Sequence, residues 1–178
     1  MAVFTREQIE QGLTELGELA HKNNIKVRLV VVGGAAMVLR FSARNSTRDI
    51  DAFIQSPEEA KVVRKFVHQI AEEHGWQEDW LNDGAKGYLV GISEGPLLFQ
   101  SKGIQVYAPS LYQLLAMKLS AWRDDVDIAD ARRILQEVKQ NNSKDEIWNA
   151  VEPFLVPGDE LTAQYAFLDL WEALYGTD

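Results

Sequence analysis

The chain has 178 residues, of which 46% are hydrophobic and 25% charged, which suits one globular domain or one domain with a helical appendage. It contains no cysteine, which excludes disulfides, thiol catalysis and cysteine-based zinc sites. The net charge of −9 argues against nonspecific nucleic-acid binding, because phosphate contacts need lysine and arginine. We find neither a long apolar run nor a secretion-signal pattern, so we expect a cytoplasmic protein without membrane segments.

The N-terminal part of the chain predicts alternating helices and strands. Thr5 suits an N-cap, with Gln8 at the capping-box position, and apolar residues then recur at helical spacing. A β-branched run that ends in Gly33 and Gly34 predicts a buried strand followed by a tight turn. The elements expected here are a helix to about His21, a strand over 26–32, a short helix over 35–41, a polar loop over 42–47 and a strand over 48–54.

The rest of the chain predicts a helix, an irregular β-rich stretch and then helices. Ser56 and Pro57 form a strong helix start, and Gly75 ends that helix after His74. The elements expected afterwards are strands over 87–92, 97–100 and 104–107, and helices over 109–122, about 128–138, 143–153 and 160–175.

This order predicts an α/β (α+β) fold with a small mixed sheet flanked by helices and a C-terminal helical extension. We expect residues 1–108 to form the α/β core and residues 109–178 the helical part, packed on the core as one unit.

Two acidic residues, Asp49 and Asp51, lie one residue apart at the start of the second predicted strand. Side chains alternate faces on a strand, so both carboxylates should point the same way. Burying such a pair is costly unless a cation lies between the carboxylates, or unless Arg44 and Arg48 pair with them. The preceding glycine pair lets a phosphate approach the backbone. The combination predicts a metal-dependent site that handles a nucleoside triphosphate.

Gly33-Gly34 followed by Asp49-x-Asp51 resembles the signature of the DNA polymerase β-like nucleotidyltransferase superfamily. In that superfamily a Gly-Gly or Gly-Ser turn follows the first strand, and the next strand carries Asp-x-Asp. A second segment is similar to the helical Lys-then-Arg/Asp segment of bacterial proteins related to the AbiE-type toxins of toxin–antitoxin systems. Its residues are Lys118, Arg123, Asp127 and Asp130. The resemblance covers about residues 25–135.

The resemblance implies that Asp49 and Asp51 hold one or two Mg²⁺ (or Mn²⁺) ions, and that the glycines contact the triphosphate of an NTP. An acceptor hydroxyl would attack the α-phosphorus, and pyrophosphate would leave. The other site residues that we expect are Ser46, Thr47 and Arg48 for nucleotide binding, and Lys118 and Asp127 for catalysis. Local alternatives stay open: Ser46 and Thr47 could cap the loop, Arg48 could be structural, Lys118 could reach solvent, and Asp127 could belong to an acidic helix start.

One departure from the superfamily concerns a third carboxylate on a later strand, which helps to activate the acceptor. The corresponding strand over 103–107 has Gln105 where we expect an acid. Either Asp127 substitutes for it, or the protein is a non-catalytic member that binds nucleotide or protein. The acceptor could be RNA, tRNA in particular, a protein side chain or a small molecule, and a cognate antitoxin is a possible partner. Any RNA contact should lie on the basic N-terminal face, where the first 48 residues hold seven basic and four acidic side chains.

Overall fold

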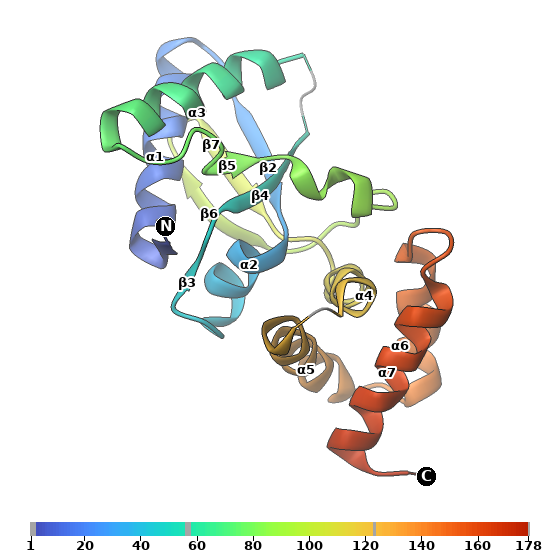
Figure 1. Ribbon diagram of the computed structural model, residues 1–178. Helices are drawn as coiled ribbons and strands as arrows, with labels where there is room; N and C mark the ends of the chain where they lie inside the picture. Colours follow the sequence, from blue (N-terminus) through green and yellow to red (C-terminus); the bar gives the residue numbers. More distant parts are fainter. Residues whose placement is uncertain (1–2, 56–57, 123, 178) are drawn as a thin grey trace. The chain divides into compact units, whose positions relative to one another are not determined.

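The computed structural model describes residues 3–55, 58–122 and 124–177 (Figure 1). The chain forms two compact units: Met1–Lys86 with Gly95–Pro109, and Gly87–Glu94 with Ser110–Asp178. The predicted helix start at Ser56 and Pro57 lies outside the described residues, as does Arg123 of the helical motif.

The first unit contains a five-stranded mixed sheet. Its strands are β2 (Val27–Val31), β4 (Ile50–Ile54), β5 (Leu81–Asn82), β6 (Leu97–Ser101) and β7 (Ile104–Tyr107), in the spatial order β5-β4-β2-β7-β6. Strand β2 is antiparallel to β4 and parallel to β7, β5 is parallel to β4, and β6 is antiparallel to β7. This sheet, together with the helices around it, confirms the predicted α/β class.

Two helices of the first unit, α1 (Arg6–Lys22) and α3 (Ala60–His74), run alongside the sheet in Figure 1. Helix α1 begins as predicted: Thr5 Oγ1 accepts from the Gln8 backbone at 3.4 Å, and the Gln8 side chain accepts from Thr5 N at 3.0 Å. The helix packs closely on the sheet at Gly17, where an added Cβ would lie 2.6 Å from Ile104 Cγ2. Glycine is therefore required there by close packing.

The predicted polar loop over 42–47 is wrong at its end. Residues Ser46–Thr47 form strand β3, which pairs antiparallel with β1 (Phe4–Thr5) in a separate two-stranded sheet. Thr47 is buried, at 7% exposure, opposite Phe4. This pairing joins segments about forty residues apart, so no local sequence pattern predicts it.

The predicted short helix over 35–41 begins two residues earlier than expected. Helix α2 (Gly33–Ala36) starts at the first glycine and continues into a π-helical turn, η1 (Met37–Phe41). The turn expected at Gly33 is still present, because Gly33 has a φ of +60°. Ala35, Ala36 and Met37 are fully buried, which explains the apolar character of this segment.

The predicted strand over 87–92 does not form. Residues Gly84–Tyr88 instead make a 3₁₀ turn, η2, and the following residues are irregular. The buried side chain of Gln113 forms hydrogen bonds with the backbone of these irregular residues. Its Oε1 accepts from Ser93 N at 2.8 Å, and its Nε2 donates to Gly91 O at 2.9 Å. These hydrogen bonds replace the ladder that a strand would need.

The second unit is helical, as the C-terminal patterns predict. Its helices are α4 (Leu111–Ala121), α5 (Asp125–Lys139), α6 (Lys144–Val151) and α7 (Glu160–Tyr175), with a 3₁₀ turn, η3 (Glu152–Phe154), between the last two. Ser110, Asp124 and Ser143 cap the first three helices through their side chains. The core includes Leu115, Ile134, Ile147 and Phe167, all buried. Among the described residues, no helix has the length and apolar character needed to cross a membrane.

Candidate active site

The two predicted carboxylates lie at the start of β4. Asp51 is the second residue of that strand and is half-buried, whereas Asp49 lies in a bend just before it. The predicted start of the strand at Arg48 is therefore two residues too early, and strict strand alternation does not relate the two aspartates. Instead, tertiary contacts bring both of them to Asn82.

Asn82, on the edge strand β5, joins the two aspartates. It is the register partner of Asp51, and its Nδ2 donates to Asp49 Oδ2 at 3.3 Å. Its Oδ1 accepts from Gly84 N at 2.8 Å, which fixes the turn after β5. The sequence analysis did not assign Asn82 to the site, although Asn82-Asp83-Gly84 is a turn signature that could have drawn attention to it.

Gly33 faces this carboxylate cluster. Its φ of +60° belongs to the left-handed region, and a Cβ added to it would lie 3.2 Å from Asp51 Oδ2. The absent side chain leaves room beside a carboxylate oxygen. A Cβ on Gly84 would lie 3.8 Å from Asp51 Oδ1. At Gly33, therefore, a side chain would crowd Asp51, whereas at Gly84 it would crowd Asn82, whose Oδ1 would lie 2.8 Å from the added Cβ.

Gly34 packs on a different set of residues. A Cβ there would lie 3.1 Å from Thr47 Cβ and 3.2 Å from Arg44 Cζ. The structure therefore brings Thr47 and the guanidinium of Arg44 to the glycine turn. Ser46 lies beside Thr47 in β3, and Arg48 is exposed in the bend that leads to Asp49.

Lys86 provides a cation on the Asp51 side of β4. Its Nζ lies 5.6 Å from the centre of the Phe53 ring and 3.8 Å from Asp83 Oδ2. Phe53 follows Asp51 by two residues in β4, so both side chains lie on one face of the strand. Lys86 therefore lies on the same face of β4 as Asp51, where its charge would favour a bound phosphate.

Lys118 and Asp127, the other predicted catalytic residues, belong to the second unit. Lys118 Nζ lies 2.9 Å from Asp127 Oδ1 and 2.7 Å from Asp130 Oδ2, so α4 and α5 are joined by a three-residue ion cluster. All three residues are buried, at 8%, 8% and 4% exposure. Of the two alternatives for Lys118, extension to solvent does not agree with this burial. Asp124 is the N-cap of α5 and accepts from Asp127 N at 2.9 Å.

Comparison with known protein families assigns the chain to a family. The family described as "Nucleotidyltransferase of unknown function (DUF6036)" matches residues 8–164, which is most of the chain. The chain belongs to this nucleotidyltransferase family. Comparisons with curated proteins and with solved structures gave no significant match.

The carboxylate pair of this family member can be tested for its fit to a divalent metal. Among the described residues, no group of three or more histidine or acidic side chains could by itself hold a metal ion. Mg²⁺ tolerates such a partial site, because it binds through one or two carboxylates and takes its other oxygens from water and substrate phosphates. The space that Gly33 leaves beside Asp51 Oδ2 is where those ligands would enter. The residues present therefore fit Mg²⁺ bound together with a triphosphate.

The register of the sheet changes the interpretation of Gln105. Gln105 pairs with Arg28 on β2, whereas Val32, four residues further on, donates its N–H to Asp51 O. Four residues along a strand span roughly 13 Å, so Gln105 and Asp51 are about this far apart along the strand direction. The expectation that Gln105 occupies the third-acid position is therefore wrong: no side chain at 105 would reach the carboxylate pair. Tyr107, which pairs with Val30, is the β7 residue nearer to that end of the sheet.

Proposed function

We propose that this protein transfers a nucleotidyl group from an NTP to a hydroxyl acceptor, in a reaction that depends on Mg²⁺ or Mn²⁺. The observation that carries the proposal is the open face of Gly33 against Asp51 Oδ2, in a chain that belongs to a nucleotidyltransferase family. Asp49 and Asp51 would hold the metal, and Asn82 would orient the Asp49 carboxylate through its 3.3 Å hydrogen bond. The metal, when bound, neutralises charge on the phosphate oxygens.

The reaction replaces a phosphoanhydride bond of the NTP with a phosphoester bond to the acceptor. The acceptor oxygen forms a bond to the α-phosphorus, the bond from that phosphorus to the pyrophosphate oxygen breaks, and pyrophosphate leaves with the bonding electrons. The hydroxyl proton passes to water or to a carboxylate. Arg44 and Lys86 are suited to bind the triphosphate, because they place cations at the glycine turn and beside β4. Nucleotide contacts by Ser46, Thr47 and Arg48, and catalytic roles for Lys118 and Asp127, stay predictions.

We propose RNA, and tRNA in particular, as the first acceptor to test. The support is the resemblance of the Lys118–Asp130 segment to AbiE-type toxin proteins. The same resemblance supports a toxin-like role, a cognate antitoxin as partner and a bacterial source. The net charge of −9 limits RNA contact to local basic surface.

A transfer assay with labelled nucleotides tests this function. Purified protein would be incubated with Mg²⁺ or Mn²⁺, each of the four α-labelled NTPs and total tRNA, beside an Asp51→Asn variant and a reaction without tRNA. We expect label on RNA from one or more NTPs, and no label with Asp51→Asn. Label on the protein itself would identify a protein acceptor instead.

A second candidate function is nucleotide binding without transfer. It is favoured by β7, which carries no acidic residue over Ile104–Tyr107. Metal-dependent NTP binding, with no label transferred to any acceptor, would support this binding function and contradict the transferase.

A further inference from the structure

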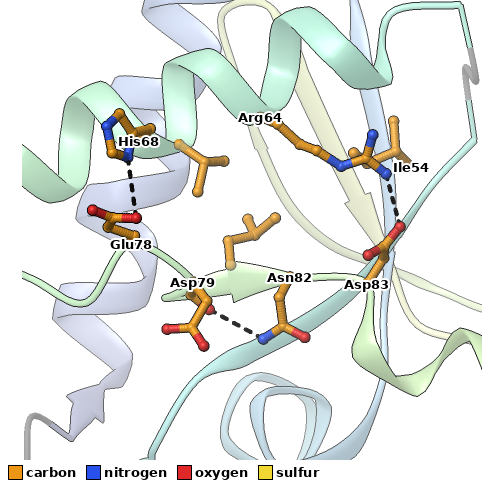
Figure 2. Close-up of a pocket in the computed structure, with 9 residues that line it drawn as sticks. Ile54, Arg64, His68, Glu78, Asp79, Asn82 and Asp83 are labelled. Carbon is orange, nitrogen blue, oxygen red and sulfur yellow. Dashed lines mark hydrogen bonds and ion pairs between the residues drawn. The ribbon is translucent and has the colours of Figure 1, made fainter.

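The two faces of the five-stranded sheet differ in what covers them. Helix α3 lies over one face, where Val67 of the helix lines a pocket of about 370 Å³ together with Ile54 and Leu81 (Figure 2). Helix α1 packs on the same side of the sheet, at Ile104. Because side chains alternate along β4, Asp51 lies on the face opposite Ile54. We call this opposite face of the sheet the Asp51 face.

A row of apolar side chains crosses the Asp51 face next to the carboxylate. Val30 on β2 is the register partner of Phe53 on one side and of Tyr107 on the other. Tyr107 is in turn the partner of Leu97, which is 45% exposed on β6. Phe53 and Tyr107 are both partly exposed, and Phe53 lies two residues, roughly 7 Å, from Asp51 along β4. Two aromatic rings are thus accessible beside the candidate active site.

Cations continue this surface toward the end of the sheet away from Asp51. Arg28 is exposed, and its Cζ lies 4.3 Å from the centre of the Tyr107 ring. Within the described part of the chain, no carboxylate pairs with this guanidinium. Lys26 lies directly before β2 and Lys102 two residues before β7, and both are exposed. Since β2 and β7 are parallel neighbours, the two lysines lie at the same end of the sheet.

Acidic side chains are scarce in the sheet, although the chain has 27 acidic and only 18 basic residues. Of the residues in the five described strands, Asp51 is the only acid. The α3 side differs, because Arg64 at the rim of the pocket already donates to Asp83 Oδ2 at 2.9 Å (Figure 2). The local charge therefore favours a polyanion on the Asp51 face.

We propose that the Asp51 face binds a single-stranded stretch of the RNA acceptor, with a base stacked at Tyr107 and a neighbouring phosphate on Arg28. The inference rests on the proposed function, because it assumes that the acceptor hydroxyl meets a nucleotide bound at Asp51. Aromatic rings bordered by cations bind single strands in this way, since every base has a face that can stack. The bases of a duplex are already stacked on each other, so a duplex cannot use the rings.

Binding of a labelled single-stranded RNA of about twelve nucleotides tests the inference by fluorescence anisotropy, beside the same sequence as a duplex. We expect the single strand to bind more tightly than the duplex. Tyr107→Leu should weaken its binding by about tenfold, because the stack with a base is lost. Tyr165→Leu, which removes a ring that is 68% exposed on α7, is the matched control and should keep wild-type affinity.

The salt dependence of binding separates the two roles. Arg28→Gln should weaken RNA binding and reduce the slope of log affinity against log salt by about 0.7, the change expected for one lost phosphate contact with a single strand. Tyr107→Leu should leave that slope unchanged. Arg132→Gln, which removes an exposed cation from α5, is the control for lost charge. Calorimetry should show wild-type Mg²⁺·NTP affinity in all of these variants.

The outcomes distinguish this inference from the proposed function. Wild-type RNA affinity in both Tyr107→Leu and Arg28→Gln would overturn the inference, as would tighter binding of the duplex or no binding of the single strand. Weakened NTP binding in place of weakened RNA binding would also overturn it, and would assign the face to the donor base. RNA binding that depends on both residues, without any label transfer, would contradict the proposed function alone. Arg28 is exposed, so its variant should fold, and thermal melts would verify both variants.

Discussion

Asn82 Nδ2 lies 3.3 Å from Asp49 Oδ2, so a residue on the edge strand β5 holds a carboxylate that sits outside its own strand. Asp49 precedes β4 and has no strand ladder of its own to orient it. The amide of Asn82 supplies that orientation. The candidate metal site therefore depends on a contact between residues 33 positions apart in the sequence.

Replacing Asn82 with alanine should lower transfer activity by about tenfold to a hundredfold, the usual cost of removing a group that orients a metal ligand. The fold should survive, because Asn82 lies on a short edge strand. Rates at saturating and limiting Mg²⁺ would show whether the defect lies in metal use. Asn23→Ala, which also removes one side-chain bond to a backbone oxygen, is a control that should leave activity unchanged. Unaltered transfer by Asn82→Ala would rule out the orienting role.

Asp51→Asn should reduce transfer more strongly than Asn82→Ala, by more than about a hundredfold, because it removes a proposed metal ligand rather than its support. Binding of Mg²⁺·NTP should weaken as well, and calorimetry would measure it. An Asp169→Asn variant, which changes an exposed carboxylate on α7, controls for the lost charge. Wild-type levels of both transfer and binding in Asp51→Asn would contradict the assignment of the site.

Gly33→Ala should cost about 1–2 kcal/mol in the free energy of unfolding, because its φ of +60° disfavours a Cβ. It should also weaken Mg²⁺·NTP binding, since the new Cβ would lie 3.2 Å from Asp51 Oδ2. Gly75→Ala is a matched control: Gly75 has a φ of +65° with nothing within 4 Å of the added Cβ. That control should lose similar stability and keep full nucleotide affinity. Equal affinity in both variants would show that Gly33 serves the backbone alone.

Lys118→Met should destabilise the protein by about 3 kcal/mol or more, because it leaves Asp127 and Asp130 buried without the lysine that joins them. Urea denaturation would measure the loss. Adding Asp127→Asn and Asp130→Asn to Lys118→Met should recover a large part of it, since the buried charges are then removed together. A Lys118→Met protein as stable as the wild type would show that the cluster contributes little to folding. The Asp127→Asn variant by itself, if folded, tests the predicted catalytic role in the transfer assay.

The start of α6 should contribute a pH-dependent term to stability. The pKa of Glu146 is lowered from its ordinary 4.5, chiefly because the Ser143 backbone N–H donates to its carboxylate, with a second bond from the Ser143 hydroxyl. A lowered pKa in the folded protein means that this contribution is present above the ordinary pKa and is lost as the pH falls through the lower one. Thermal melts should show Glu146→Gln less stable than the wild type at neutral pH, with the gap closing in acid. A gap that is independent of pH would contradict this account.

Several features were predictable from the sequence because their causes are local. The capping box at Thr5 and the apolar spacing of the helices act within a few residues of each other. The capping box located the start of α1, and periodicity located α3 and the helices of the second unit. The glycine pair and the two aspartates were recognisable because the backbone freedom of Gly33 and the charges of Asp49 and Asp51 belong to residue type. The sequence by itself therefore determined the fold class and indicated the nucleotidyltransferase family.

Other features were decided only by tertiary structure. The role of Asn82, the pairing of β3 with β1 and the replacement of a predicted strand by bonds to Gln113 all join segments distant in the chain. Strand register likewise removed Gln105 from the carboxylate pair, because pairing between strands is set by packing across the sheet and not by the pattern within one strand. Residue types and local spacing thus identified the candidate site residues, whereas long-range strand pairing decided which of them lie close to one another.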